Sequence, residues 1–140
     1  MERTETKGRK KKYATAEEAA AAQREQILAS MKKWHSTKEG RANNLANAYK
    51  QLDRNARRGE STITPQWIID NIFTSKCHWC GNSDWRVLGC DRINQHLPHT
   101  PDNVQCSCGK CNVERGRHSF DWFTKYQRSK KNAPKQLTLF

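Results

Sequence analysis

Four cysteines in two short pairs constrain this sequence more than any other feature. Cys77 and Cys80 are separated by two residues, as are Cys108 and Cys111, and 27 residues lie between the pairs. Two intervening residues let both thiolates of a tight turn reach one metal ion, and two such pairs complete the tetrahedral shell that zinc prefers. We therefore predict a structural zinc site. The alternatives are a redox pair and buried cysteines without a metal.

The residues next to these pairs refine the prediction. Gly81 and Gly109 are expected to supply the backbone freedom that the turns need. Cys106 is close enough to Cys108 in sequence to exchange places with it as a ligand, whereas Cys90 is flanked by strand-like residues and is expected in the core. Because the gap between the pairs is longer than a simple zinc ribbon requires, we expect a folded segment between them.

The composition explains why the fold needs such a staple. The chain of 140 residues has 26 Lys and Arg against 14 Asp and Glu, a formal net charge of +12, and only 34% hydrophobic residues. Its mean hydropathy is −1.07. A chain of this kind builds a small core, which a metal site can hold together. The positive charge indicates a polyanionic partner, nucleic acid above all, although ribosome-like basic tails are an alternative.

The sequence also predicts the compartment. It has no run of about 18 apolar residues, the length that a transmembrane helix needs. The basic N-terminus lacks the apolar stretch of a signal peptide. Cysteines in a reducing compartment are more often metal ligands than disulfides. We expect an intracellular, cytoplasmic protein without a membrane partner.

The N-terminal half is predicted to be helical. Residues 1–12 form a basic arm that we expect to be disordered and to bind phosphates. An alanine-rich helix is expected from about 15 to 34. A second, from about 38 to 58, is expected to end at Gly59. Its expected apolar residues, at helical spacing, are Leu45, Ala48, Tyr49 and Leu52.

The C-terminal half is predicted to be a hairpin between helices. Thr64 as N-cap and Pro65 at the first position predict a short helix with Trp67, Ile68 and Phe73 as core residues. Strands are expected at 85–93 and 103–107, joined by a loop. One helix is expected from 111 to 128, and its expected packing residues are Phe120, Trp122, Phe123 and Tyr126.

A hairpin followed by a helix can bring a carboxylate and an amide to one point. Asp91 lies in the first expected strand, and Asn112 lies at the start of the helix. A carboxylate and an amide oxygen, completed by water and phosphate, suit Mg²⁺ or Mn²⁺. Such an ion polarises a scissile phosphate. We predict a second, catalytic metal site at Asp91 and Asn112.

Four motifs carry a resemblance to a known family. C-x-x-C, LG-x-DRIN, HTPDNV and C-x-x-CN follow one another in this order. Together they resemble the HNH (ββα-metal, His-Me finger) endonucleases, particularly their zinc-containing phage and large-virus branch, over about residues 41–126. The resemblance implies an α+β fold, a small zinc-stapled ββα-metal module preceded by helices. It also implies metal-dependent hydrolysis of DNA.

The resemblance assigns roles by position. Asp91 resembles the family's metal-binding aspartate, and Asn112 resembles the residue that completes the metal site. Asn103 resembles the central asparagine that braces the loop through hydrogen bonds. Arg92 stands where most of the family has the histidine that deprotonates water. His99 stands where relatives commonly carry tyrosine.

Arg92 leaves the general base open. A guanidinium cannot accept a proton near neutral pH, but it can hold a phosphate and offset transition-state charge. The proton is then expected to leave through His96, through His99 or through a metal-bound water. His118, in the expected helix after Asn112, is a further candidate to reach the site or a phosphate. The loop histidines can also be plain solvated residues.

The last five residues, QLTLF, are apolar after a basic linker. They are similar to the motif by which proteins bind the bacterial sliding clamp, the beta subunit of DNA polymerase III. The alternative is a tail folded onto the protein's own core. The residues expected to bind the clamp are Gln136, Leu137, Leu139 and Phe140. Tethering of this kind would raise the local concentration at replicating DNA.

These expectations combine into one domain plan and one function. The plan has a basic arm at 1–12, a helical lead-in at 13–60, the zinc-binding HNH-like domain at 61–128 and a flexible tail at 129–140. The expected DNA-binding residues are Lys10, Lys11, Lys12, Arg54, Arg57, Arg58, Arg115 and Arg117. We predict an HNH-type DNA endonuclease of a phage or mobile element, acting in a bacterial cytoplasm. The alternatives are a weakly catalytic HNH-like protein that binds DNA or the clamp and modulates replication, and an RNA-binding protein.

Overall fold

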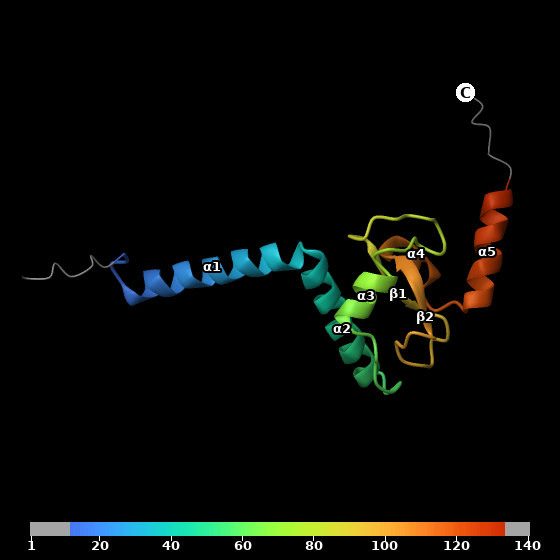
Figure 1. The fold of residues 1–140 in the computed structure, drawn as a ribbon, viewed down its shortest axis with the longest axis horizontal. Helices are drawn as coiled ribbons and strands as arrows, with labels where there is room; N and C mark the ends of the chain where they lie inside the picture. The colour runs from blue at the N-terminus through green and yellow to red at the C-terminus, as the bar shows by residue number, and fades with distance from the viewer. Residues whose placement is uncertain (1–11, 134–140) are drawn as a thin grey trace, which may run out of the picture. The chain divides into compact units, whose positions relative to one another are not determined.

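The structure is a computed structural model that describes residues 12–133. Within these residues the fold is α+β, with five helices and one two-stranded sheet (Figure 1). The elements, in order, are α1 (Ala16–His35), α2 (Lys38–Asn55), α3 (Pro65–Asn71), β1 (Leu88–Arg92), β2 (Val104–Cys108), α4 (Gly109–Arg115) and α5 (Phe120–Asn132). The chain divides between Trp34 and His35 into two compact units.

Helix α1 begins at a capping box. The Thr15 hydroxyl accepts a hydrogen bond from the Glu18 N–H at 3.1 Å, and the Glu18 carboxylate accepts one from the Thr15 N–H at 3.4 Å. This reciprocal pair satisfies amide groups that the first helical turn leaves without partners. The predicted helix from 15 to 34 is confirmed to within a residue at each end. None of its residues is buried.

Helix α2 ends earlier than predicted. The chain turns left-handed at Arg57, with φ of 54°. The Arg58 N–H bonds to the Asp53 carbonyl, and the Arg57 N–H bonds to the Arg54 carbonyl. This is the Schellman arrangement, in which glycine usually takes the left-handed position. The prediction that the helix continues to Gly59 is therefore wrong, because an arginine closes it after Asn55.

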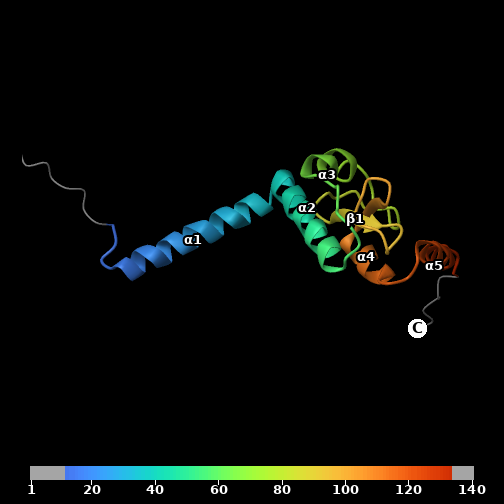
Figure 2. The ribbon, with the colours of Figure 1, turned by 90° about the horizontal axis from the view of Figure 1, so that it is seen from below.

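The buried face of α2 also differs from the prediction. Ala42, Ala46 and Tyr49 are buried, and Asp53 follows them on the same face. Ala48 is exposed, and Leu52 is 54% exposed. Small side chains on the buried face let α3 pack closely against α2 (Figure 2). Helix α2 belongs to the same compact unit as the sheet, and its buried residues are part of the core.

Helix α3 begins as predicted. The Thr64 hydroxyl accepts a hydrogen bond from the Trp67 N–H at 3.1 Å, and Pro65 occupies the first turn. Ile68 and Phe73 are buried, and Trp67 packs at the edge of the core.

The hairpin is fastened to α2. β1 and β2 are antiparallel, with Leu88 opposite Cys108 and Arg92 opposite Val104. The Cys90 N–H donates to the Tyr49 hydroxyl at 2.8 Å. Gly89 permits this contact, because a Cβ there would lie 3.0 Å from the hydroxyl oxygen. β1 is shorter than predicted and β2 is shifted by one residue, but the hairpin is confirmed.

The predicted helix over 111–128 is two helices. Gly116, with φ of 52°, ends α4, and the Ser119 hydroxyl caps α5 by accepting from the Trp122 N–H. Phe123 is fully buried, and its ring lies 4.7 Å from that of Trp79. Trp122 is 45% exposed and stacks on His118 at 3.8 Å. The prediction that Trp122 packs into the core is therefore wrong.

None of the helices within residues 12–133 has the length and apolarity needed to cross a bilayer. The predicted basic arm, apart from Lys12, and the predicted clamp-binding residues lie outside the described part of the chain.

Candidate functional site

The four paired cysteines form one cluster, here called the sulfur cluster. Cys77 and Cys80 lie in the turn after α3, Cys108 ends β2, and Cys111 lies in α4. The turn closes where the Gly81 N–H donates to the Cys77 carbonyl at 2.9 Å. Gly81 has φ of 78°, which confirms its predicted role. Gly109 does not adopt such a conformation, because it is the first residue of α4.

The sulfur atoms have the spacing of a tetrahedral metal site. One ligand atom from each of the four cysteines lies within 4.8 Å of the others. A tetrahedron with zinc–sulfur bonds of about 2.3 Å has edges of about 3.8 Å. The Cys80 Sγ lies 3.7 Å from the Cys108 Sγ, close to this edge length. The cluster can therefore hold a metal ion such as zinc.

The other two cysteines are not part of this cluster. Cys106 is buried and its Sγ lies 3.6 Å from the Ile72 carbonyl. Burial raises the pKa of Cys106 to about 11 and that of Cys90 to about 12. At Cys77 burial also raises the pKa, but backbone N–H groups outweigh it and lower the pKa to about 7. The ligand position belongs to Cys108 and not to Cys106, because the Sγ of Cys108 is the one that lies within 4.8 Å of the other three sulfur ligands.

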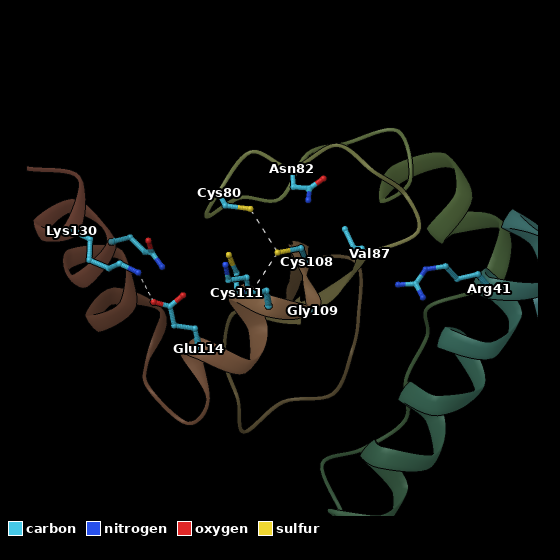
Figure 3. A pocket seen from close by; sticks show the side chains of 11 residues that line it. Arg41, Cys80, Asn82, Val87, Cys108, Gly109, Cys111, Glu114 and Lys130 are labelled. Carbon is cyan, nitrogen blue, oxygen red and sulfur yellow. Dashed lines mark hydrogen bonds and ion pairs between the residues drawn. The ribbon is translucent and has the colours of Figure 1, made fainter. Parts of the chain in front are cut away.

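A hollow of about 720 Å³ opens beside the sulfur cluster (Figure 3). Its one acidic lining residue is Glu114, whose Oε1 accepts from the Lys130 Nζ at 2.7 Å. The cysteine sulfurs that line this hollow can bind a metal, whereas the Glu114 carboxylate is already paired with Lys130. It does not contain the residues predicted to carry phosphodiester chemistry.

Those residues meet in a second hollow, here called the Asp91 cleft, of about 340 Å³. The predicted site residues among its lining are Asp91, Arg92, His99 and Asn112. They come from β1, the loop between the strands and α4. Arg58 and Arg117 add positive charge to the lining.

Asp91 is buried and already hydrogen-bonded. Its Oδ1 accepts from the Arg115 Nη1 at 2.8 Å, and its Oδ2 accepts from the Trp79 Nε1 at 3.3 Å. A carboxylate has about four lone-pair sites, so these two bonds leave acceptor positions on both oxygens. With the exposed amide of Asn112 in the same cleft, the donor set suits a hard cation such as Mg²⁺ or Mn²⁺. Arg115 competes with such an ion for Asp91.

Arg115 corrects a prediction. It is fully buried, with a relative exposure of 0%. Besides Asp91, it donates to the carbonyls of Arg92, Ile93 and His118. Its guanidinium is committed to holding β1, the following loop and the start of α5 together. The expectation that Arg115 binds DNA is therefore wrong.

Asn103 braces the loop between the strands, as predicted. Its Nδ2 donates to the carbonyls of Asn94 and Pro98, each at 3.0 Å. Its Oδ1 accepts from the Asn94 N–H at 2.9 Å. These bonds fix the loop that carries His99.

His99 is 5% exposed, whereas His96 is exposed and lies beside a different hollow. The His99 Nδ1 lies 2.9 Å from the Asp53 Oδ2, and the His99 ring stacks on Tyr49 at 4.2 Å. Burial lowers the pKa of His99 despite the opposing effect of Asp53. His99 therefore stays neutral near pH 7.

Asp53 was not predicted. It is fully buried, with a relative exposure of 0%. Burial raises its pKa, but hydrogen bonds from His99 and Arg58 outweigh burial, so the net pKa is lowered. Its position four residues after Tyr49 places it on the buried face of α2. An aspartate on the buried face of a helix is the signal in the sequence that could have identified Asp53.

The remaining predicted DNA-binding arginines differ in position. Arg54, Arg57 and Arg117 are exposed. Arg58 is half-buried and donates from Nε to the Asp53 Oδ1 at 3.1 Å. Arg92 is half-buried and donates to the Gln95 carbonyl. Burial, then the nearby Arg58, lowers the pKa of Arg92, yet a guanidinium remains charged in proteins.

Comparison of this chain with protein-family models, with curated proteins and with solved structures gives no match.

Proposed function

We propose that this protein is a metal-dependent DNA endonuclease of the HNH type. The observation that carries the proposal is the Asp91 cleft, which brings together Asp91, Arg92, His99 and Asn112 from separate parts of the chain. A cleft that combines a carboxylate, an amide, a histidine and positive charge has the groups that phosphodiester hydrolysis uses. The net charge of +12 favours a nucleic acid as the substrate.

The roles follow from the positions of the side chains. Asp91 and Asn112 would hold a divalent cation, which supplies Lewis-acid activation of the scissile phosphate when bound. Arg92 contacts a phosphate and offsets the charge that develops on it. Arg117, exposed at the rim of the cleft, contacts the neighbouring backbone. Asn103 holds the loop in place and has no direct role in the chemistry.

The sulfur cluster has a structural role in this proposal. Zinc bound to four cysteines has no open position for water or substrate. It ties the turn after α3 to the end of β2 and to α4, the helix that carries Asn112. The metal at the cluster thus fixes the site without taking part in the reaction.

A second candidate is a DNA-binding protein without cleavage activity. The ion pair between Asp91 and the buried Arg115 favours it, because the guanidinium lies 2.8 Å from the oxygen that a metal would bind. Recruitment by a sliding clamp remains a prediction under either candidate.

Metal-dependent nicking of DNA separates the two candidates. Supercoiled, branched and single-stranded DNA would be incubated with the protein in Mg²⁺, in Mn²⁺ and in EDTA. We expect cleavage with the metals, and a loss of about 100-fold or more in Asp91→Asn and Asn112→Ala. Asp91→Asn retains an oxygen acceptor for Arg115 but removes the charge that pairs with it, whereas Asn112→Ala changes an exposed residue and leaves that ion pair intact.

Asp70→Asn is the matched control, because Asp70 is exposed on α3, outside the residues assigned to the Asp91 cleft. Zinc content and circular dichroism would verify that each variant is folded. If the folded, zinc-loaded wild type cleaves none of these substrates with either metal, the protein is a binding protein and the nuclease proposal is wrong.

A further inference from the structure

A buried carboxylate of α2 holds the one deeply buried histidine of the Asp91 cleft. Asp53 accepts the His99 N–H at 2.8 Å and contacts the His99 Nδ1 at 2.9 Å, both through Oδ2. Its Oδ1 accepts from the Arg58 Nε at 3.1 Å. A fully buried charge is costly unless it is paired and hydrogen-bonded. Asp53 therefore stays ionised, and its position and that of the ring are fixed together.

These contacts select one form of the imidazole. An ionised carboxylate only accepts hydrogen bonds, so the Nδ1 of His99 carries the hydrogen. In the neutral ring the Nε2 is then an acceptor. Within residues 12–133 the His99 ring is hydrogen-bonded through its Nδ1 to Asp53, and the residue lines the Asp91 cleft. The stacked Tyr49 ring, with an interplanar angle of 17°, restricts rotation of the imidazole.

We propose that His99 is the general base of the Asp91 cleft and that Asp53 is its positioning residue, an inference that rests on the proposed nuclease function. The Nε2 takes a proton from the attacking water, and the oxygen of that water forms a bond to phosphorus. The bond from phosphorus to the leaving oxygen breaks, and that oxygen takes a proton from solvent. His99 thus supplies the function that Arg92 cannot.

The charges around His99 are compatible with this role. From α2, Asp53 favours a proton on the ring. From the turn after α2 and from β1, Arg58 and Arg92 disfavour it, as burial does. Asp91 also lines the cleft. The neutral ring can accept a proton at neutral pH, and Asp53 offsets part of the cost that burial and the two arginines impose on the charged ring.

The alternative loop histidine lacks this arrangement. His96 is exposed, and its backbone N–H donates to the Asn94 Oδ1 at 3.0 Å. Among the residues that the structure describes, no carboxylate is hydrogen-bonded to its ring. The adjacent hollow that it lines does not contain Asp91 or Asn112.

The experiment measures steady-state cleavage kinetics of the full-length, zinc-loaded protein across pH. We expect His99→Ala to lower kcat by about 100-fold or more, and free imidazole to restore at least part of the rate. Asp53→Asn is expected to lower kcat with little change in KM. It is also expected to move the acid limb of the pH profile to lower pH, because Asp53 favours protonation of the ring. A purely structural anchor would give neither the rescue nor the shifted limb.

Controls and a second variant keep the outcomes distinct. His35→Ala and Asp70→Asn are exposed matched controls, and imidazole should stimulate neither of them nor the wild type. His99→Gln retains a donor for Asp53, so its loss of activity is expected without loss of fold. If the wild type cleaves and His99→Gln cleaves equally well with the same pH profile, His99 is not the general base, Asp53 does not position one, and the nuclease function stands. If the wild type does not cleave, both are wrong.

Discussion

The two ends of one short hairpin carry two sites built in different ways. At the end where Leu88 pairs with Cys108, the sulfur cluster takes its ligands from two pairs that are each local in sequence. At the other end, where Arg92 pairs with Val104, the Asp91 cleft takes its residues from α2, β1, the loop and α4.

The difference lies in what orients the side chains. A C-x2-C turn brings its two sulfurs together by backbone geometry alone, and a metal completes the site. The Asp91 cleft depends on a contact between Asp53 and His99, which are 46 residues apart. The first site follows from spacing, whereas the second exists only after α2 has packed on the hairpin. The following variants test this contrast, from the largest expected effect to the smallest.

Removal of a sulfur ligand is expected to have the largest effect. In Cys108→Ser we expect loss of zinc and unfolding of the unit that begins at His35, because metal binding and folding are coupled. The lost stability should exceed about 5 kcal/mol, a large share of what a small domain has. Zinc stoichiometry and circular dichroism check this.

Cys106→Ala is the matched control for that variant. It changes a buried cysteine outside the cluster and should keep one zinc ion per chain. If Cys108→Ser stays folded and binds zinc as the wild type does, the sulfur cluster is not the staple of the fold.

Replacement of Arg115 should damage the cleft without touching a sulfur ligand. Arg115→Met leaves the buried Asp91 charge without its ion pair, which costs about 3–5 kcal/mol. Urea denaturation of the zinc-saturated protein measures the loss. Arg117→Met, at an exposed position, should change stability by no more than about 0.5 kcal/mol. Equal stabilities of the two variants would mean that the Asp91–Arg115 pair does not support the fold.

Acid should destabilise the cleft through His99. The folded-state pKa of His99 is lowered by burial, whereas an unfolded histidine has a pKa of about 6.5. As the pH falls below about 6.5, the unfolded chain gains a proton that folded His99 does not accept, so stability falls. The lowered pKa of Asp53 adds a second loss, which begins near pH 4.

His99→Gln isolates this effect. Release of a metal ion from the sulfur cluster at low pH would affect both proteins equally. The difference between their urea-denaturation curves from pH 7.5 to about 5 therefore reports His99 alone. Parallel losses in the two proteins would mean that the pKa of His99 is not lowered by folding.

The smallest expected effect is a gain in stability at the end of α2. Arg57 is left-handed with φ of 54°, a conformation that costs a residue with a Cβ about 1 kcal/mol. Arg57→Gly should therefore stabilise the protein by about 0.5 kcal/mol after the entropy cost of glycine. Arg54→Gly, inside the same helix, should destabilise it by about 1 kcal/mol. Thermal unfolding compares the two, and a loss of stability in both would show that Arg57 is not strained.

The parts of the fold that could be predicted from sequence are those with local signals. Thr64 and Pro65 mark the start of α3, and the cysteine spacing marks the sulfur cluster. The end of α2 and the break at Gly116 were missed, because an arginine took the left-handed position in one and a glycine interrupted an apparently continuous pattern in the other.

Some of the residues that line the Asp91 cleft could be predicted from sequence, but the contacts between them could not. The hairpin and helix predicted that Asp91 and Asn112 would meet, and His96 and His99 were alternative proton acceptors; Asp91, Asn112 and His99 line one cleft. Sequence alone assigned Arg115 to DNA because its charge suggested exposure, whereas it is buried against Asp91. Asp53 was missed because the apolar stripe of α2 was placed one face away from the face that packs.

The position of Asp53 on α2 bears on how the protein can be shortened. A fragment that starts after residue 60 would keep all four sulfur ligands. Cysteine spacing alone would therefore suggest it as a sufficient fragment. It would lose Asp53 as the anchor of His99 and Tyr49 as the partner of the Cys90 amide. Such a fragment would bind metal, but Asp53 would not orient its His99. A graft of this site into another protein must therefore include α2.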